Sequence, residues 1–136
     1  MIRSQPIGGP VKAALRRKAT YEAGMAGEAS ARAALERDGW TILGSRLRTP
    51  AGEIDLVAEK DGLLAVIEVK ARPTLAVAAA ALTPRQRNRL TAACDILLLQ
   101  HPDWGQQGVR FDVILVDAQG RVRRITDAFR VGDPLE

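Results

Sequence analysis

A chain of 136 residues suffices for one domain, and its hydrophobic (46%) and charged (26%) fractions are those of an ordinary soluble globular protein. It has no apolar run near the roughly 18 residues of a membrane-spanning helix, its basic start lacks the apolar core of a secretory signal, and one cysteine excludes an internal disulfide and a cysteine-based zinc site. The net charge of +4 is compatible with a nucleic-acid partner but is not specific for one. These features predict a cytoplasmic protein.

Proline and glycine divide the first third of the chain into an arm and a helix. Residues 1–12 hold two of each and predict a flexible basic arm, which leaves residues 13–136 as a single domain. A helix is expected over residues 20–38, with Thr20 as its N-cap and Gly39 as its stop. At helical spacing, three of its side chains share one face: Met25, Glu28 and Leu35.

The remainder alternates strands with one further helix. Strands are predicted over residues 40–48, 53–59, 63–71, 110–116 and 122–126, with Asp61-Gly62 as a hairpin turn. Residues 73–82 are alanine-rich and predict a loop with some helical character. Thr83-Pro84 is typical of an N-cap followed by Pro at the first helical position, so a helix is expected up to residue 100. The resulting α-β-β-β-α-β-β order predicts an α/β fold, a central mixed β-sheet flanked by helices.

Two of these strands carry ionisable side chains two positions apart. Glu53 and Asp55 share one face of their strand, and Glu68 and Lys70 share one face of the next. Charged groups on strands that are otherwise apolar cost stability unless they pair, hydrate or bind a metal. The hairpin would place the two strands about 4.8 Å apart, although the sequence does not determine their register. We therefore interpret these strands as a candidate active site.

Paired carboxylates beside a lysine suit phosphodiester hydrolysis. One or two Mg²⁺ or Mn²⁺ ions held by Asp and Glu oxygens can activate water, stabilise the transition state and assist the leaving oxygen. A neighbouring lysine can orient or deprotonate the water. The set Asp55, Glu68 and Lys70 meets this requirement.

The spacing of these residues resembles the PD-(D/E)xK nuclease signature, and four blocks in order resemble the YraN-like family. That family comprises small bacterial proteins with a restriction-endonuclease-like fold, related to archaeal Holliday junction resolvases. The resemblance covers roughly residues 20–116. The blocks are Gly27-Glu28, Gly52-Glu53-Ile54-Asp55-Leu56-Val57-Ala58, Ile67-Glu68-Val69-Lys70-Ala71-Arg72 and Arg110-Phe111-Asp112-Val113.

The resemblance implies a metal-dependent nuclease acting on DNA, including branched or junction DNA. Cleaving a junction would require two sites related by two-fold symmetry, and hence a homodimer. The implied roles are Asp55, Glu68 and the Val69 carbonyl as metal ligands, Lys70 as the residue that positions water, Glu28 as a further acidic group, and Glu53 as a supporting or second-metal ligand.

The chain departs from the family pattern at three positions. Pro50 lies five residues before Asp55 instead of next to it, Arg46 stands where relatives carry Asn, and Gln86 stands where they carry Lys. Gln86 lies on the apolar stripe of its helix, so we expect it to face the sheet. Together with Arg72 and Arg48, it is a candidate nucleic-acid contact.

Simpler interpretations remain for several of these residues. Glu53 and Glu68 would also suit the exposed face of a half-covered sheet, with Lys70 as a cross-strand partner. A non-catalytic module that binds nucleic acid or protein is the alternative function, and RNA the alternative substrate. Outside the site, Asp112 is predicted to be structural. Three arginines of the second helix are predicted to form a solvated surface: Arg85, Arg87 and Arg89.

Overall fold

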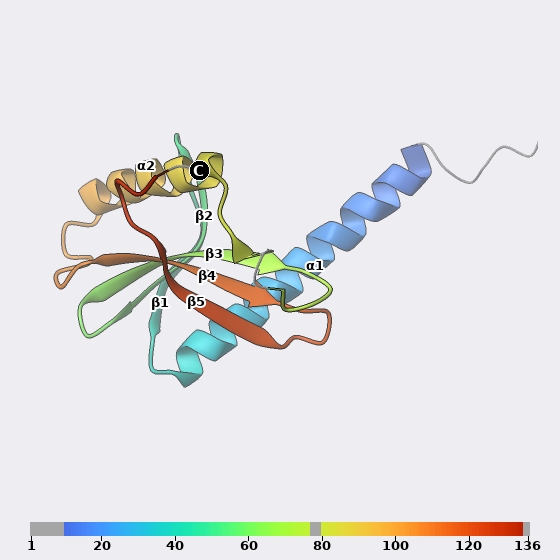
Figure 1. Ribbon diagram of the computed structural model, residues 1–136, viewed down its shortest axis with the longest axis horizontal. Coiled ribbons are helices and arrows are strands. Elements are labelled where there is room, and N and C mark those ends of the chain that lie inside the picture. The colour runs from blue at the N-terminus through green and yellow to red at the C-terminus, as the bar shows by residue number, and fades with distance from the viewer. Residues whose placement is uncertain (1–9, 77–79, 135–136) are drawn as a thin grey trace, which may run out of the picture.

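The computed structural model describes residues 10–76 and 80–134, which form two helices and five strands (Figure 1). In chain order they are α1 (Pro10–Arg37), β1 (Thr41–Thr49), β2 (Gly52–Lys60), β3 (Leu63–Ala71), α2 (Pro84–Gln100), β4 (Val109–Val116) and β5 (Val122–Phe129). The mixed α/β fold predicted from the sequence is confirmed.

The strands form one mixed sheet in the order β1-β2-β3-β4-β5. Neighbouring strands run antiparallel except β3 and β4, which are parallel. A parallel pair needs a long crossover, and α2 provides it between β3 and β4. The parallel ladder is unbroken from Leu64↔Val109 to Ala71↔Val116. Strand β3, which carries the candidate residues Glu68, Val69 and Lys70, therefore lies at the centre of the sheet.

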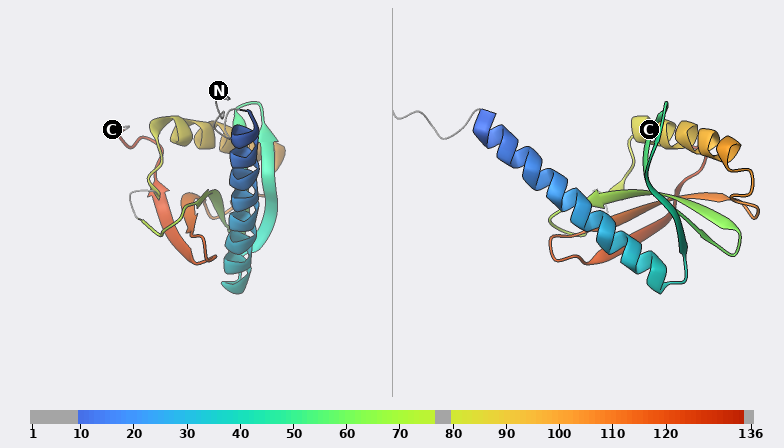
Figure 2. Two further views of the ribbon diagram at one scale, coloured as in Figure 1. Left: turned by 90° about the vertical axis from the view of Figure 1, so that its right-hand side faces the viewer. Right: turned by 180° about the vertical axis from the view of Figure 1, so that it is seen from behind.

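One helix covers each face of the sheet (Figure 2). On one face, Ala31 and Leu35 of α1 pack against Ile67 and Ile114. On the other face, α2 contributes its own buried stripe to a core with Ile54, Val57, Val66, Phe111 and Val113; the stripe consists of Leu90, Ala93, Cys94 and Leu97. Both faces of β3 are therefore buried, which explains its nearly continuous apolar sequence.

Helix α1 is longer than the sequence predicted. It begins at Pro10, not at Thr20, so Thr20 is not its N-cap. The first turns are rich in Ala, Lys and Arg, which favour helix without any tertiary contact, and Pro is well suited to a first helical position. Met25 is 39% exposed and does not share the buried face that was expected for it, because α1 packs against the sheet only from Gly27 onward.

Other element boundaries agree with the sequence or extend it. The helix does end before Gly39, and Asp61 and Gly62 both adopt positive φ values (51° and 80°), as a type I′ hairpin turn requires. Strand β5 continues to Phe129, three residues further than predicted, because Phe129 pairs with Phe111 and stacks on its ring at 4.6 Å. Of the expected arm, residues 1–9 lie outside the described residues and 10–12 belong to α1; the alanine-rich loop is described except for residues 77–79.

The start of α2 is confirmed in detail. The Thr83 hydroxyl accepts a hydrogen bond from the Gln86 backbone N–H at 3.1 Å, and the Gln86 side chain accepts one from the Thr83 N–H at 2.9 Å. This reciprocal capping box satisfies two backbone donors that the helix leaves free. It also gives Gln86 a structural role.

Replacing Thr83 with alanine should therefore lower the free energy of unfolding by about 1 kcal/mol, the usual effect of losing an N-cap. Chemical denaturation monitored by circular dichroism would measure the change. Thr74→Ala, in the preceding loop, is the matched control. An equal effect of both substitutions would contradict a capping role for Thr83.

Candidate active site

Asp55 lies where β2 and β3 separate from each other, a place that we call the fork. The regular pairing of these strands ends at Leu56↔Ile67, and beyond it an Asp55 carboxylate oxygen accepts a hydrogen bond from the Val69 N–H at 2.8 Å. Ile54 packs in the core beneath α2, whereas Leu56 packs in the core beneath α1. Residues two apart on a regular strand share a face, so β2 rotates at Asp55 and directs this side chain toward β3.

Glu68 and Lys70 approach the fork from the α2 side of β3. Glu68 forms an ion pair with Arg89 of α2, and Lys70 donates a hydrogen bond to the Ala81 carbonyl at 2.6 Å. Lys70 is only 7% exposed. Burial and the neighbouring Arg72 lower the pKa of Lys70, so at a given pH a larger fraction of its amine is uncharged and free to accept a proton than in an exposed lysine.

The carboxyl of Glu68 is strongly perturbed. Burial, the negative charge of Asp55 and a hydrogen bond shared with Asp55 raise the pKa of Glu68 from 4.5 to about 7, against the opposing effects of Arg89 and Lys70. The carboxyl of Glu68 thus lies close to that of Asp55 in a partly dehydrated place. A fork of this kind would be stabilised by a bound cation.

The raised pKa of Glu68 predicts a pH dependence of stability. Between about pH 4.5 and 7 the folded protein holds a proton on Glu68 that the unfolded chain has released, so stability should fall as pH rises through this window. Thermal unfolding in a chelator at pH 5 to 8 measures this fall. Glu68→Gln should reduce it, whereas the exposed control Glu36→Gln should not. A pH dependence that Glu68→Gln leaves unchanged would refute the assignment.

A cleft of about 340 Å³ opens on the α1 side of the fork. Its lining residues come from α1, β1, β2 and β3 and are Gly24, Glu28, Arg46, Arg48, Glu53, Asp55 and Val69. Glu28 accepts a hydrogen bond from Arg46 at 2.8 Å, and Glu53 pairs with Arg48 at 3.5 Å. Asp55 therefore shares the cleft with both carboxylates, each of which is held by an arginine.

These acidic groups do not form one compact cluster. In the described part of the chain, no three carboxylate, thiol or imidazole groups are arranged so as to hold a metal ion. The structure brings Asp55, Glu68 and Lys70 together at the fork, and it places Glu28 and Glu53 on the far side of Asp55. Neither Glu28 nor Glu53 joins the Asp55–Glu68 pair directly.

The three candidate nucleic-acid contacts occupy different places. Arg48 is exposed at the cleft rim and opposite Glu53 in the β1–β2 register. Arg72 is exposed just beyond β3, where its backbone N–H bonds to the Val116 carbonyl at 2.9 Å. Gln86 neither lines the cleft nor contacts the fork, because its side chain caps α2.

Arg89 lies at the site, so the prediction that it belongs to a solvated helix surface is wrong. Its guanidinium pairs with Glu68, and its stem crosses Gly52, where an added Cβ would lie 2.5 Å from the Arg89 Cγ. Gly52 also adopts a φ of 139°, which favours glycine. A signal was present in the sequence: Arg89 lies three residues after Gln86 and four before Ala93, on the buried stripe of α2. Arg87 is likewise half-buried, whereas Arg85 is exposed as predicted.

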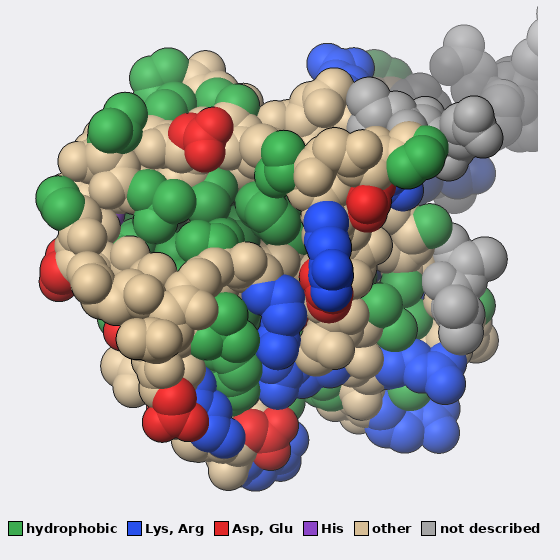
Figure 3. Space-filling model, turned by 60° about the vertical axis from the view of Figure 1, so that its left-hand side comes forward, with side chains coloured by type: hydrophobic (Ala, Val, Ile, Leu, Met, Phe, Trp, Pro, Cys, Tyr) green, Lys and Arg blue, Asp and Glu red, His purple; other side chains and the backbone are tan. Residues whose placement is uncertain are grey.

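A larger hollow lies at the other end of the sheet. It has a volume of about 480 Å³ and lies between α2, the start of β4 and the residues after β5. Hydrophobic side chains gather in a hollow on the face shown in Figure 3. The carboxylates of the fork do not line this hollow, so its size does not make it the candidate active site.

Fold and site together define a mixed α/β protein in which two carboxylates and a buried lysine meet at a fork of the central sheet. Residues 27–116 match the sequence model of the uncharacterised protein family UPF0102, and the chain belongs to that family. A UPF0102 protein of Granulibacter bethesdensis is 64% identical over 110 residues, covering 81% of this chain and 70% of the relative.

Further relatives match nearly the whole chain. A UPF0102 protein of Rhodopseudomonas palustris is 44% identical over 127 residues, 93% of each chain. One of Azorhizobium caulinodans is 42% identical over 131 residues, 96% of this chain and 98% of the relative. The membership that the YraN-like resemblance implied is confirmed. Within the described residues, neither helix has the length and apolar character needed to cross a membrane.

Proposed function

We propose that this protein is a metal-dependent nuclease that hydrolyses DNA phosphodiester bonds, including those of branched or junction DNA, on a restriction-endonuclease-like fold related to that of Holliday junction resolvases. The observation that carries the proposal is the convergence of Asp55 and Glu68 at the fork, with the pKa of Glu68 raised to about 7. A carboxyl whose pKa is strongly raised by burial and by a neighbouring carboxylate is typical of active sites.

The donor set at the fork fits Mg²⁺ or Mn²⁺. Mg²⁺ prefers oxygen ligands, keeps several waters and commonly uses one or two carboxylates, so Asp55, Glu68 and the Val69 carbonyl would suffice. When bound, the metal would stabilise negative charge on the phosphate and lower the pKa of a bound water. Glu28 and Glu53 would act from the cleft side, as acceptors for water or for a second ion.

Lys70 is the proposed proton-handling group. Its lowered pKa and its position two residues from Glu68 suit an amine that orients an attacking water and accepts its proton. Arg89 holds Glu68 from the α2 side, and we assign it a positioning role. On entry of a cation, Glu68 would release its shared proton and keep Arg89 as a partner.

A non-catalytic nucleic-acid-binding module is the second candidate function. The specific observation in its favour is that Glu28, Glu53 and Glu68 are each already paired with an arginine. These ion pairs compensate the negative charge of the carboxylates without a metal ion. This candidate predicts binding of nucleic acid without cleavage.

The test is cleavage of supercoiled, linear duplex, single-stranded and four-way-junction DNA, and of RNA, with Mg²⁺ or Mn²⁺. We expect metal-dependent cleavage by the unmodified protein. Lys70→Ala should reduce the rate by about 10²- to 10⁴-fold, the usual contribution of an acid–base group. The surface variant Glu36→Gln should cleave normally.

Each outcome of that test has a distinct meaning. Cleavage that Lys70→Ala leaves undiminished would refute the role of Lys70. Binding of DNA without cleavage of any substrate would favour the non-catalytic module. Cleavage restricted to four-way junctions should be accompanied by a homodimer in sedimentation, because resolution needs two symmetric sites.

A further inference from the structure

The N-terminal half of α1, residues 10–23, projects beyond the sheet (Figures 1 and 2). Residues 10–18 are exposed except for the half-buried Ala13. A Cβ added at Gly24 would meet nothing within 4 Å, whereas one added at Gly27 would lie 3.3 Å from the Ala71 Cβ. The helix therefore begins to pack only near Gly27. We call residues 10–23 the projecting half of α1.

The projecting half is strongly basic. It carries Lys12, Arg16, Arg17 and Lys18, and no acidic residue precedes Glu22. Among the ion pairs of the described residues, Lys18 is the one basic side chain of this segment with an acidic partner, at 3.9 Å from Glu22. Fourteen residues of α-helix extend about 21 Å, which is long enough to follow several phosphates of a duplex.

Its position links this charge to the candidate active site. Gly24 and Glu28, the next residues along α1, line the cleft that contains Asp55. A polyanion held by the projecting half would thus lie directly beside the fork. Isolated helices of this length are marginal in water, so a partner that neutralises the basic side chains would also stabilise the helix.

We propose that the projecting half of α1 binds the phosphate backbone of duplex DNA and guides it into the cleft beside Asp55. The inference takes DNA as the substrate from the proposed function. It adds that the projecting half of α1 provides affinity for that DNA. The contacts are to phosphates, so they would strengthen binding of any sequence without selecting one. Two exposed apolar side chains, Val11 and Leu15, make an anionic membrane surface the main rival partner.

The test uses the full chain with Lys12→Gln, Arg16→Gln and Arg17→Gln combined, and keeps the Lys18–Glu22 pair. Glutamine preserves helix propensity. The matched control combines Arg37→Gln, Lys60→Gln and Arg130→Gln, which remove the same charge at exposed positions outside the projecting half. Affinity for a labelled DNA duplex is measured between 50 and 200 mM salt, in the presence of EDTA so that no metal-dependent cleavage occurs. Thermal unfolding checks that both variants fold.

We expect the variant in the projecting half to bind at least about tenfold more weakly than the control. The slope of log K against log salt concentration should also be smaller in magnitude for this variant, by about 2 to 3. Each lost phosphate contact reduces that slope by roughly 0.9. Affinity within twofold of the control, or absence of duplex binding by the unmodified protein, would overturn the proposal. Loss of binding to anionic vesicles with unchanged DNA affinity would overturn it in favour of a membrane.

Failure of this inference is distinguishable from failure of the proposed nuclease function. Binding in EDTA depends on the projecting half and not on catalysis, whereas cleavage depends on Asp55. Unchanged DNA affinity of the variant together with metal-dependent cleavage by the unmodified protein would remove the inference alone. Weakened binding without any cleavage would support the inference and reject the nuclease.

Discussion

Asp55→Asn is expected to remove both the metal-dependent stabilisation and the cleavage activity of this protein. In the unmodified protein, Mn²⁺ at a hundred times its dissociation constant would raise the free energy of unfolding by about 2.7 kcal/mol. Asparagine retains an oxygen that can accept the hydrogen bond from the Val69 N–H but lacks the negative charge. The thermal shift with Mn²⁺ should disappear, and the cleavage rate should fall by more than about a hundredfold, beyond the usual effect of losing an outer-shell partner.

Glu53→Gln is the matched control for this experiment. Glu53 lies on the same strand and lines the same cleft, but it pairs with Arg48 and not with the fork. It should therefore retain most of the Mn²⁺ shift. A full Mn²⁺ shift in Asp55→Asn would exclude Asp55 as a ligand.

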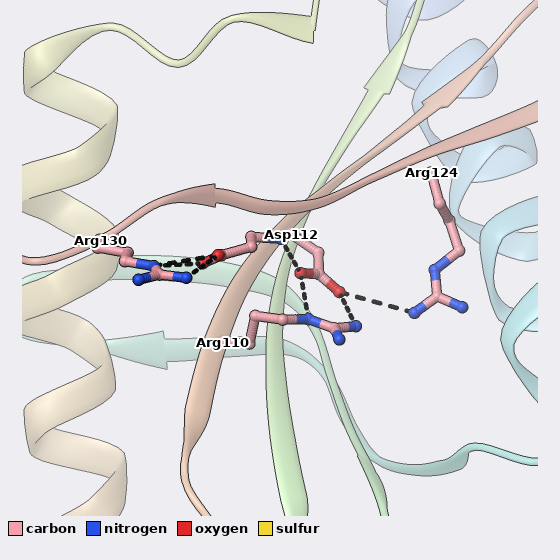
Figure 4. Close-up of polar contacts among 5 residues, drawn as sticks. Arg110, Asp112, Arg124 and Arg130 are labelled. Atoms are coloured by element: carbon pink, nitrogen blue, oxygen red, sulfur yellow. Dashed lines mark hydrogen bonds and ion pairs between the residues drawn. The ribbon is translucent and has the colours of Figure 1, made fainter.

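The largest loss of stability is expected from Asp112→Ala. Asp112 is completely buried, and Arg110 donates to both of its carboxylate oxygens at 2.8 Å (Figure 4). Arg124 approaches it at 3.6 Å, and the Asp127 N–H donates to it at 2.9 Å. Removing one partner of a buried ion pair leaves uncompensated charge, so the free energy of unfolding should fall by about 3–5 kcal/mol. Urea denaturation would measure the loss.

Asp127→Asn provides the comparison within the same network. Asp127 pairs with Arg130 at 2.8 Å near the surface, where ion pairs contribute about 0–1 kcal/mol. Asparagine also tolerates the positive φ of this residue, 55°. A loss for Asp112→Ala no larger than that for Asp127→Asn would contradict the structural role of Asp112.

Strand and helix positions were largely predictable from the sequence because their signals are local. The boundaries of β3 agree with the prediction, and no boundary of β1, β2 or β4 differs from it by more than about one residue. The capping residue and proline of α2 and the Asp61-Gly62 turn act through the backbone of their immediate neighbours. The sequence did not predict the C-terminal residues of β5, because their pairing depends on Phe111, which is distant in the sequence.

The candidate site was predictable in composition but not in arrangement. Alternation along two apolar strands singled out Glu53, Asp55, Glu68 and Lys70. The family resemblance then assigned metal and water roles to Asp55, Glu68 and Lys70, and those roles stay predictions. The alternation did not predict that β2 rotates at Asp55, that Glu28 and Glu53 face the opposite side of the fork, or that Arg89 reaches Glu68. Each of these depends on how strands and helices pack against one another.

The sequence by itself thus determined the order of elements, the hairpin turn, the capped helix and the acidic strands, since short-range backbone and side-chain preferences decide these features. Only the tertiary structure decided which carboxylates lie close together, which arginines form ion pairs with them, and at which residue α1 begins to pack against the sheet. Those properties arise from register, twist and packing between segments far apart in the chain, which no local pattern encodes.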